Sequence, residues 1–137
     1  MFGLRNIKFT PAAGARPPVA NDFDIRARES ALNQAILNGQ ALEAFERYYH
    51  EDVVMQENDA KPTLGKDANR DREYTFFDAI TEFRSVKLLG SAVQGNLSFS
   101  HWHFDFDHRD WGTRDYRQVA VREWRDGQVV RETFYYG

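Results

Sequence analysis

The stretch NLSFSHWHFDFDH, residues 96–108, alternates between two kinds of side chain. Groups that can move protons or bind metal ions share one parity: His101, His103 and Asp105. Large aromatic rings share the other parity: Trp102, Phe104 and Phe106. Because successive side chains of a strand point to opposite sides of the sheet, one set is buried and the other faces outward.

The two histidines are close enough to act on one ligand, since residues two apart on a strand lie about 6.6–6.8 Å apart at the backbone. Three roles are open for them. They could pass protons or donate to a substrate oxygen, hold a metal ion with Glu57 or Asp105, or be structural. We expect the first role and no metal ion, because His-x-His alone is a weak zinc motif. Asp105 is then expected to orient His103.

The composition narrows the functional classes. The chain has 137 residues, 42% of them hydrophobic, which suits one domain with a single core. Acidic and basic residues are interspersed and give a net charge of −3, so we expect no nucleic-acid partner. The absence of cysteine excludes disulfides and thiolate chemistry. No apolar run approaches the ~18 residues of a membrane span, so we expect a cytoplasmic protein without a membrane partner.

Local patterns predict the order of elements. Residues 1–22 are expected to form an extended arm, because residues 11–20 hold three of the four prolines. Residues 23–137 are expected to form one domain. The expected elements are a helix over 23–38, a short helix within ALEAFERYY, a strand over 51–58, a helix over 66–79, and four strands from residue 82 onward.

Turn residues separate the last four strands, at Gly95-Asn96, at Trp111-Gly112 and at Asp126-Gly127. Helices that precede a run of antiparallel strands predict an α+β fold with the helices packed on one face of the sheet.

That order, together with YYHEDVVMQEN, LGKDA and EWRDGQVVRETFYYG, resembles the nuclear transport factor 2-like superfamily. The superfamily includes SnoaL-like polyketide cyclases, ketosteroid isomerases and limonene epoxide hydrolases, and the resemblance covers roughly residues 25 to 137. It implies a cone, in which three N-terminal helices pack on a strongly bent, mostly antiparallel sheet and enclose an apolar pocket. The partner it implies is a small apolar molecule, and the chemistry needs no cofactor.

The resemblance also implies site residues. Glu57 falls where the isomerases place the carboxylate that abstracts a proton beside a carbonyl, and Met55 falls with it. On their strand, His101 and His103 would point into the pocket. Trp102, Phe104 and Phe106 would then lie outside and form a homodimer interface. The inward positions of the next two strands would be Gln118, Arg122, Trp124, Glu132, Phe134 and Tyr136, and Arg122 would pair with Glu132.

Parts of the known machinery are missing. Leu32 and Ala120 occupy the places of the isomerases' oxyanion-hole residues, and Phe134 stands where the hydrolases have a second aspartate. We therefore expect a small-molecule enzyme using acid–base chemistry, as an isomerase, cyclase or hydrolase, on an apolar carbonyl or ring compound. The alternative is a non-catalytic ligand-binding or association domain. A continuous pocket favours the enzyme, and a pocket plugged by Phe134, Trp124 and Tyr136 favours the binding domain.

Overall fold

The structure, a computed structural model, describes residues 20–137, with side chains from residue 24 onward. Helix α1 (Ala20–Leu37) begins three residues before the expected start and so includes the last three residues of the expected arm, 1–22. The other residues of that arm, 1–19, lie outside the described residues. Helices α2 (Ala41–Tyr48) and α3 (Lys66–Asp78) follow the predicted spacing. Within the described part of the chain, no helix is long and apolar enough to cross a membrane.

All strands belong to one mixed sheet. The strands are β1 (Tyr49–Glu57), β2 (Thr63–Leu64), β3 (Ile80–Gln94), β4 (Leu97–His108), β5 (Gly112–Arg125) and β6 (Gln128–Tyr135). Their order is β2-β1-β6-β5-β4-β3, and only β1 and β6 run parallel. The predicted α+β class, with three helices and a mostly antiparallel sheet, is confirmed, and only the short strand β2 was not expected.

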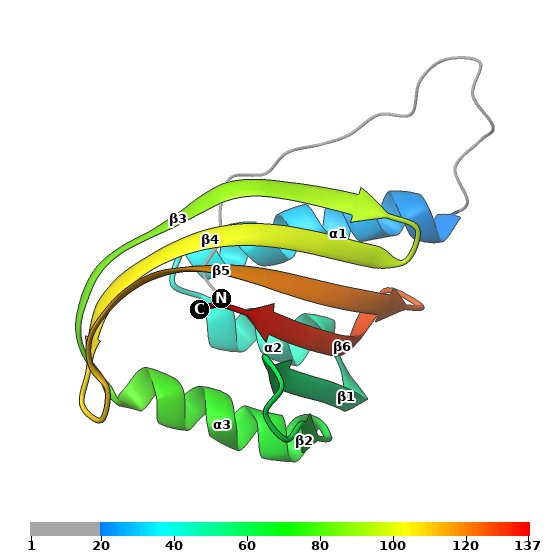
Figure 1. The fold of residues 1–137 in the computed structure, drawn as a ribbon. Helices are drawn as coiled ribbons and strands as arrows, with labels where there is room; N and C mark the ends of the chain where they lie inside the picture. Colours follow the sequence, from blue (N-terminus) through cyan, green and yellow to red (C-terminus); the bar gives the residue numbers. More distant parts are fainter. Residues whose placement is uncertain (1–19) are drawn as a thin grey trace.

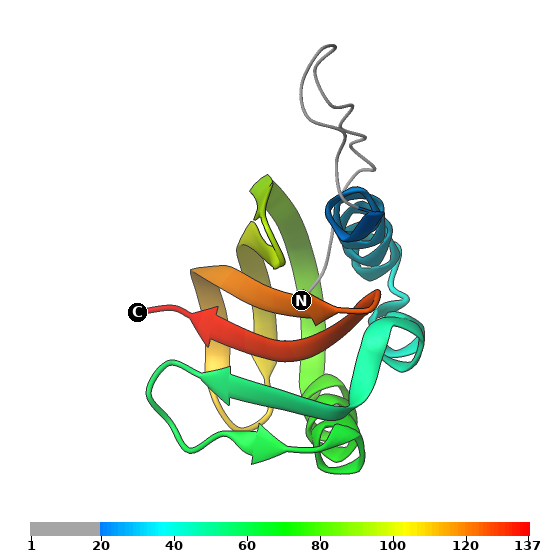
Figure 2. The ribbon, with the colours of Figure 1, turned by 90° about the vertical axis from the view of Figure 1, so that its right-hand side faces the viewer.

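The sheet is strongly bent, and bulges in β3 explain part of the bend. Strand β3 carries an extra residue relative to β4 at three points, near Thr81, Arg84 and Leu89, so 15 residues run beside 12. An extra residue bends a strand and increases its twist. Strands β3, β4 and β5 therefore arch over the helices (Figure 1). From the side, β5, β6 and β1 lie next to one another in that order (Figure 2).

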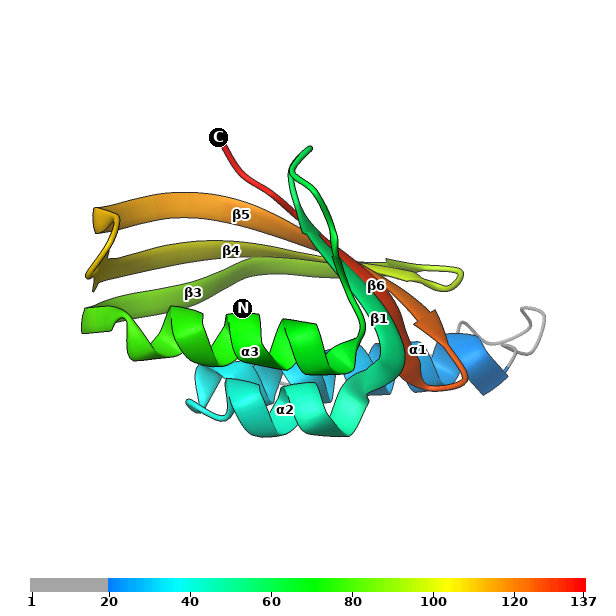
Figure 3. The ribbon, with the colours of Figure 1, turned by 90° about the horizontal axis from the view of Figure 1, so that it is seen from below.

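All three helices lie on the same side of the sheet (Figure 3), so that side carries the core. Ile25, Leu32 and Ile36 of α1 repeat at helical spacing and are buried, as is Phe45 of α2. These side chains belong to one apolar cluster with the inner side chains of β4 and β5.

The inner face of β4 is the opposite of the one expected. Trp102, Phe104 and Phe106 are 0–1% exposed and sit in the core, whereas the predicted pocket residues of β4 point outward: His101, His103 and Asp105. The cause is the pairing with β5, which sets Trp102 opposite Gln118 and Phe104 opposite Tyr116. Side chains directly opposite each other share a face, and the inward face of β5 is the one that was predicted.

The expected dimer interface is therefore also wrong. Trp102, Phe104 and Phe106 are enclosed within the chain, so they offer no apolar patch to a second copy. The outer face carries polar groups instead. There Arg84 donates hydrogen bonds to Asp105 and Asp107.

The core contains a buried ionic network centred on Arg122 of β5. Its Nε donates to Glu132 of β6 at 2.7 Å, which confirms the predicted pair, and its Nη1 donates to both carboxylate oxygens of Glu29 of α1 at 3.0 Å. The Tyr49 hydroxyl donates to the other Glu132 oxygen at 2.6 Å. All of these side chains are essentially inaccessible. One guanidinium therefore joins α1 to the middle of the sheet.

Replacing Arg122 by Met tests this network. Glu29 and Glu132 would lose their shared counter-charge in the core, so we expect the free energy of unfolding to fall by about 3–5 kcal/mol. Urea unfolding measures the change. The control is Arg84→Met, which breaks ion pairs on the solvated outer face and should cost a small fraction of that loss. Equal losses in the two variants would contradict the account.

Candidate active site

A cavity of about 410 Å³ opens between α3 and the concave face of the sheet. Its walls combine aromatic rings with a few polar groups. The lining residues are Glu57, Asp71, Arg72, Glu73, Thr75, Phe76, Phe104, His108, Asp110, Trp111, Tyr116, Gln118 and Phe134. A cavity of this size, largely apolar with a small number of convergent polar groups, is typical of a small-molecule site.

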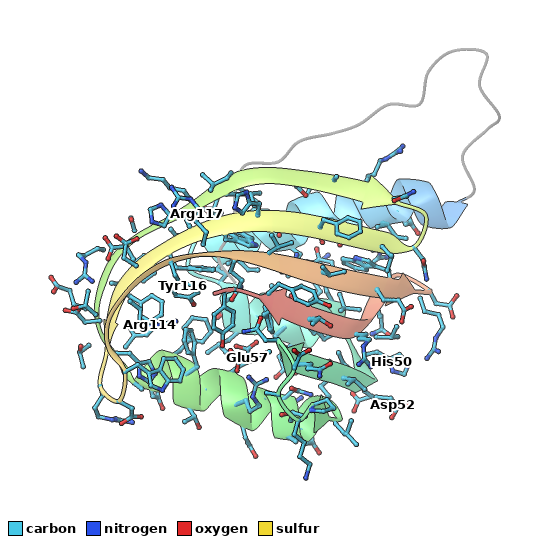
Figure 4. The ribbon with its side chains drawn as sticks, in the orientation of Figure 1. His50, Asp52, Glu57, Arg114, Tyr116 and Arg117 are labelled. Atoms are coloured by element: carbon cyan, nitrogen blue, oxygen red, sulfur yellow. The ribbon has the colours of Figure 1, made fainter. Side chains whose placement is uncertain are left out.

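Glu57 lies at the end of β1 and reaches the cavity as predicted. Its Oε1 accepts a hydrogen bond from the Tyr136 hydroxyl at 3.0 Å, and its Oε2 accepts one from Arg72 Nη2 at 2.8 Å. The side chain is 39% exposed. Glu57 and Tyr116 both project into the space between sheet and α3, whereas Arg117, the next residue of β5, lies on the outer side (Figure 4). Glu57 is thus held as an oriented carboxylate at the cavity wall.

Glu73 of α3 is a second carboxyl group in the same cavity and was not predicted from the sequence. It is 6% exposed. Burial, and after it the charge of Glu132, raise its pKa to about 8, so the group keeps its proton at neutral pH. Lys66, Asn69 and Glu73 share the buried face of α3, but all three are polar, so the spacing of apolar residues gave no signal for that face.

Two tyrosine hydroxyls accompany the carboxyl groups. Burial raises the pKa of Tyr116 to about 12, and burial together with the charge of Glu57 raises the pKa of Tyr136. Both therefore remain protonated at neutral pH, and the Tyr136 hydroxyl donates to Glu57. Their rings are neighbours, with centroids 5.6 Å apart.

The far end of the cavity is closed by a stack of rings that was not predicted. His108, the last residue of β4, lies parallel to Trp111 with centroids 3.8 Å apart and planes 9° apart. Phe76 of α3 packs on the same imidazole at 5.8 Å. Trp111 lines the cavity and is 55% exposed.

The predicted ligand-binding residues divide into two groups. Gln118 and Phe134 line the cavity with Glu57, and Tyr136 joins them through its hydrogen bond. Met55 and Trp124 also have the predicted inward parity, but both are enclosed in the core, where the Trp124 indole donates to Ser98. Arg122 is engaged in the ionic network rather than at the cavity wall.

The predicted catalytic residues of β4 do not reach the cavity. The His103 imidazole is paired with Asp115 on the outer face, so Asp105 does not orient it and pairs with Arg84 instead. His101 is exposed. In residues 24–137 there is no cluster of three or more His, Asp or Glu side chains arranged to hold a metal ion.

Residues 31–132 match the family model described as the SnoaL-like domain. This match covers most of the chain, which therefore belongs to the SnoaL-like family. No curated protein matches the sequence.

Several solved structures share the fold. A proposed SnoaL-like polyketide cyclase from Mesorhizobium loti is 21% identical, with a TM-score of 0.75 over 82% of this chain and 98% of that chain. A proposed polyketide cyclase from Xanthomonas campestris pv. campestris is 22% identical, with a TM-score of 0.67 over 86% and 93%. An NTF-2 like protein of unknown function from Burkholderia xenovorans LB400 is 21% identical, with a TM-score of 0.67 over 83% of each chain. At these identities the likeness concerns the fold.

The protonated state of Glu73 predicts a pH-dependent stability. Its pKa in the folded chain lies above the ordinary value of 4.5, so the folded chain binds the extra proton between about pH 4.5 and 8 and loses stability as the pH rises through that range. The Glu73→Gln variant lacks this loss. Thermal unfolding of both proteins across this range should show that the melting temperature of the wild type falls relative to that of the variant as the pH rises.

The matched control for this measurement is Glu51→Gln, which removes one exposed carboxylate of β1. Its melting temperature should follow the wild type at every pH. If the Glu73→Gln curve also runs parallel to the wild type, Glu73 is ionised in the folded chain and the assignment is wrong.

Proposed function

We propose that the chain is an enzyme that moves a proton on a small aromatic ketone without a cofactor. The observation that carries the proposal is the pair of carboxyl groups, Glu57 and Glu73, in one aromatic cavity but in contrasting environments. Glu57 accepts hydrogen bonds from a cation and a hydroxyl, whereas Glu73 is buried and has a raised pKa. A carboxylate that accepts hydrogen bonds and a buried carboxyl group with a raised pKa are suited to divide the roles of base and acid.

In this proposal Glu57 is the general base. Its carboxylate takes a proton from the carbon beside the substrate carbonyl, and the electron pair of the broken C–H bond moves to the carbonyl oxygen as an enolate. Arg72 and Tyr136 orient the carboxylate through their hydrogen bonds. The conjugate acid of Glu57 then returns the proton to carbon, at the same or at a conjugated position, so the reaction is balanced without a co-reactant.

Glu73 supplies the complementary donor. As a protonated carboxylic acid it donates a hydrogen bond to the carbonyl oxygen, on which negative charge develops in the transition state. The positions that resemble the isomerases' oxyanion hole, Leu32 and Ala120, hold no donor side chain. Placement of the donor on α3 instead of the sheet provides the same electrostatic function from a different element.

The walls of the cavity support an aromatic substrate. Rings from four elements face it, among them Phe76, Phe104 and Phe134, and aromatic side chains pack well against flat rings. The names of the structural neighbours from Mesorhizobium loti and Xanthomonas campestris, which refer to polyketide cyclases, agree with a ring ketone. The cavity is open, with Trp124 in the core and Phe134 only in its wall, which favours an enzyme over a plugged binding domain.

Exchange of carbon-bound hydrogen tests the proposal without knowledge of the natural substrate. β-Tetralone is a cyclic ketone fused to a benzene ring, with acidic hydrogens beside its carbonyl, and its conversion to the deuterated form in D₂O is followed by NMR. We expect the protein to accelerate this exchange and Glu57→Gln to reduce the acceleration by about 10²- to 10⁴-fold, as expected for loss of a general base.

The control is Asp105→Asn, which removes a carboxylate from the outer face and should leave the exchange rate unchanged. The acceleration should also decline above about pH 8, where Glu73 loses its proton. A Glu57→Gln variant that binds β-tetralone and exchanges it at the wild-type rate would refute the role of Glu57.

A further inference from the structure

His108 has a buried nitrogen without a hydrogen-bond partner. The Asp110 backbone N–H donates to its Nδ1 at 3.2 Å, so in the neutral ring Nδ1 is the acceptor and the hydrogen is on Nε2. Within the described residues, Nε2 has no partner, although the residue is only 4% exposed. Leaving a buried donor unpaired is unfavourable, and such groups are frequent at functional sites.

The surroundings of His108 place the residue in the wall of the candidate active site. The residue lines the cavity, and its ring faces are covered by Trp111 and Phe76. Neither ring nitrogen is hydrogen-bonded to a carboxylate of the described chain, unlike His103 on the outer face, which is paired with Asp115.

His108 lies at the opposite end of the cavity from Glu57. It pairs with Gly112 at the start of β5, whereas Glu57 pairs with Phe134 of β6, whose partner on β5 is Ala120, eight residues further along that strand. One end of the cavity therefore holds the groups proposed for proton transfer. A second polar group, His108, lies beyond the aromatic part of the wall.

We propose that His108 selects the substrate by donating a hydrogen bond from Nε2 to a second oxygen, carried on the edge of the ring system opposite the reacting ketone. The inference rests on the proposed function for the position of that ketone, and it narrows the substrate to aromatic ketones with an ether, hydroxyl or carbonyl oxygen at the far edge. In the ligand-free chain Nε2 is closed off from solvent, so side chains beside the edge of the imidazole must shift to admit the oxygen.

Two isosteric probes test the assignment. One is β-tetralone with a methoxy group on the ring edge opposite the ketone, and the other carries an ethyl group there. They differ by one acceptor oxygen. We expect the wild type to bind the methoxy compound about 3- to 10-fold more tightly, the range of one neutral hydrogen bond. His108→Phe keeps an aromatic ring without the donor and should abolish the preference, and His108→Gln, which retains an N–H donor, should restore part of it.

A direct readout accompanies the affinities. In protein labelled with ¹⁵N, the His108 Nε2–H signal should shift on addition of the methoxy probe but not of the ethyl probe, whether or not the variants fold well. An unchanged methoxy preference in His108→Phe, or no difference in the ¹⁵N response, would overturn the inference.

Glu57→Gln separates this inference from the proposed function. That variant should keep the methoxy preference, because His108 is intact, while it loses hydrogen exchange. A methoxy preference in a wild type that catalyses no exchange would refute the catalytic proposal and leave the hydrogen bond of His108 supported.

Discussion

The pairing of β4 with β5 determines which side chains of this protein are enclosed. Once Trp102 stands opposite Gln118, every second residue of both strands faces the helices. The bulges of β3 then curve the same sheet around that face, so the rings of β4 serve as core near α1 and as cavity wall near α3. Core and candidate site are consequently two parts of one surface. A shift of the pairing by one residue would turn charged groups inward and remove both.

This dependence explains what the sequence could and could not predict. Helices, strands and turns follow from local spacing and from pairs such as Asp126-Gly127, and they were predicted closely. The buried face of β4 was wrong because alternation gives two faces without saying which is inside. The inward-facing side chains of β5 were predicted correctly. Pairing β4 with β5 across the turn between them would have given the correct inward face of β4 as well. Glu73 was missed because a polar residue on a polar helix carries no local mark of burial, which here comes from packing of α3 on the sheet.

The ionisable side chains between the core and the cavity influence one another. Arg122 is surrounded by Glu29 and Glu132, so two carboxylates share one guanidinium deep in the core. The excess negative charge acts on Glu73, whose pKa is raised first by burial and then by Glu132. Glu57 lies further out and has its own cation, Arg72. The same network that ties α1 to the sheet thereby helps to keep one cavity carboxyl group protonated beside another that is stabilised as a carboxylate.

The proposed division of roles requires Glu73 to be protonated and Glu57 to be ionised at neutral pH. Infrared spectroscopy measures this directly, because protonated and ionised carboxyl groups absorb at well-separated frequencies, and difference spectra against Glu73→Gln and Glu57→Gln assign the bands. At neutral pH we expect Glu73→Gln to remove a protonated carboxyl band and Glu57→Gln to remove a carboxylate band. Loss of a carboxylate band in both variants would contradict it, since the cavity would then hold two bases and no acid.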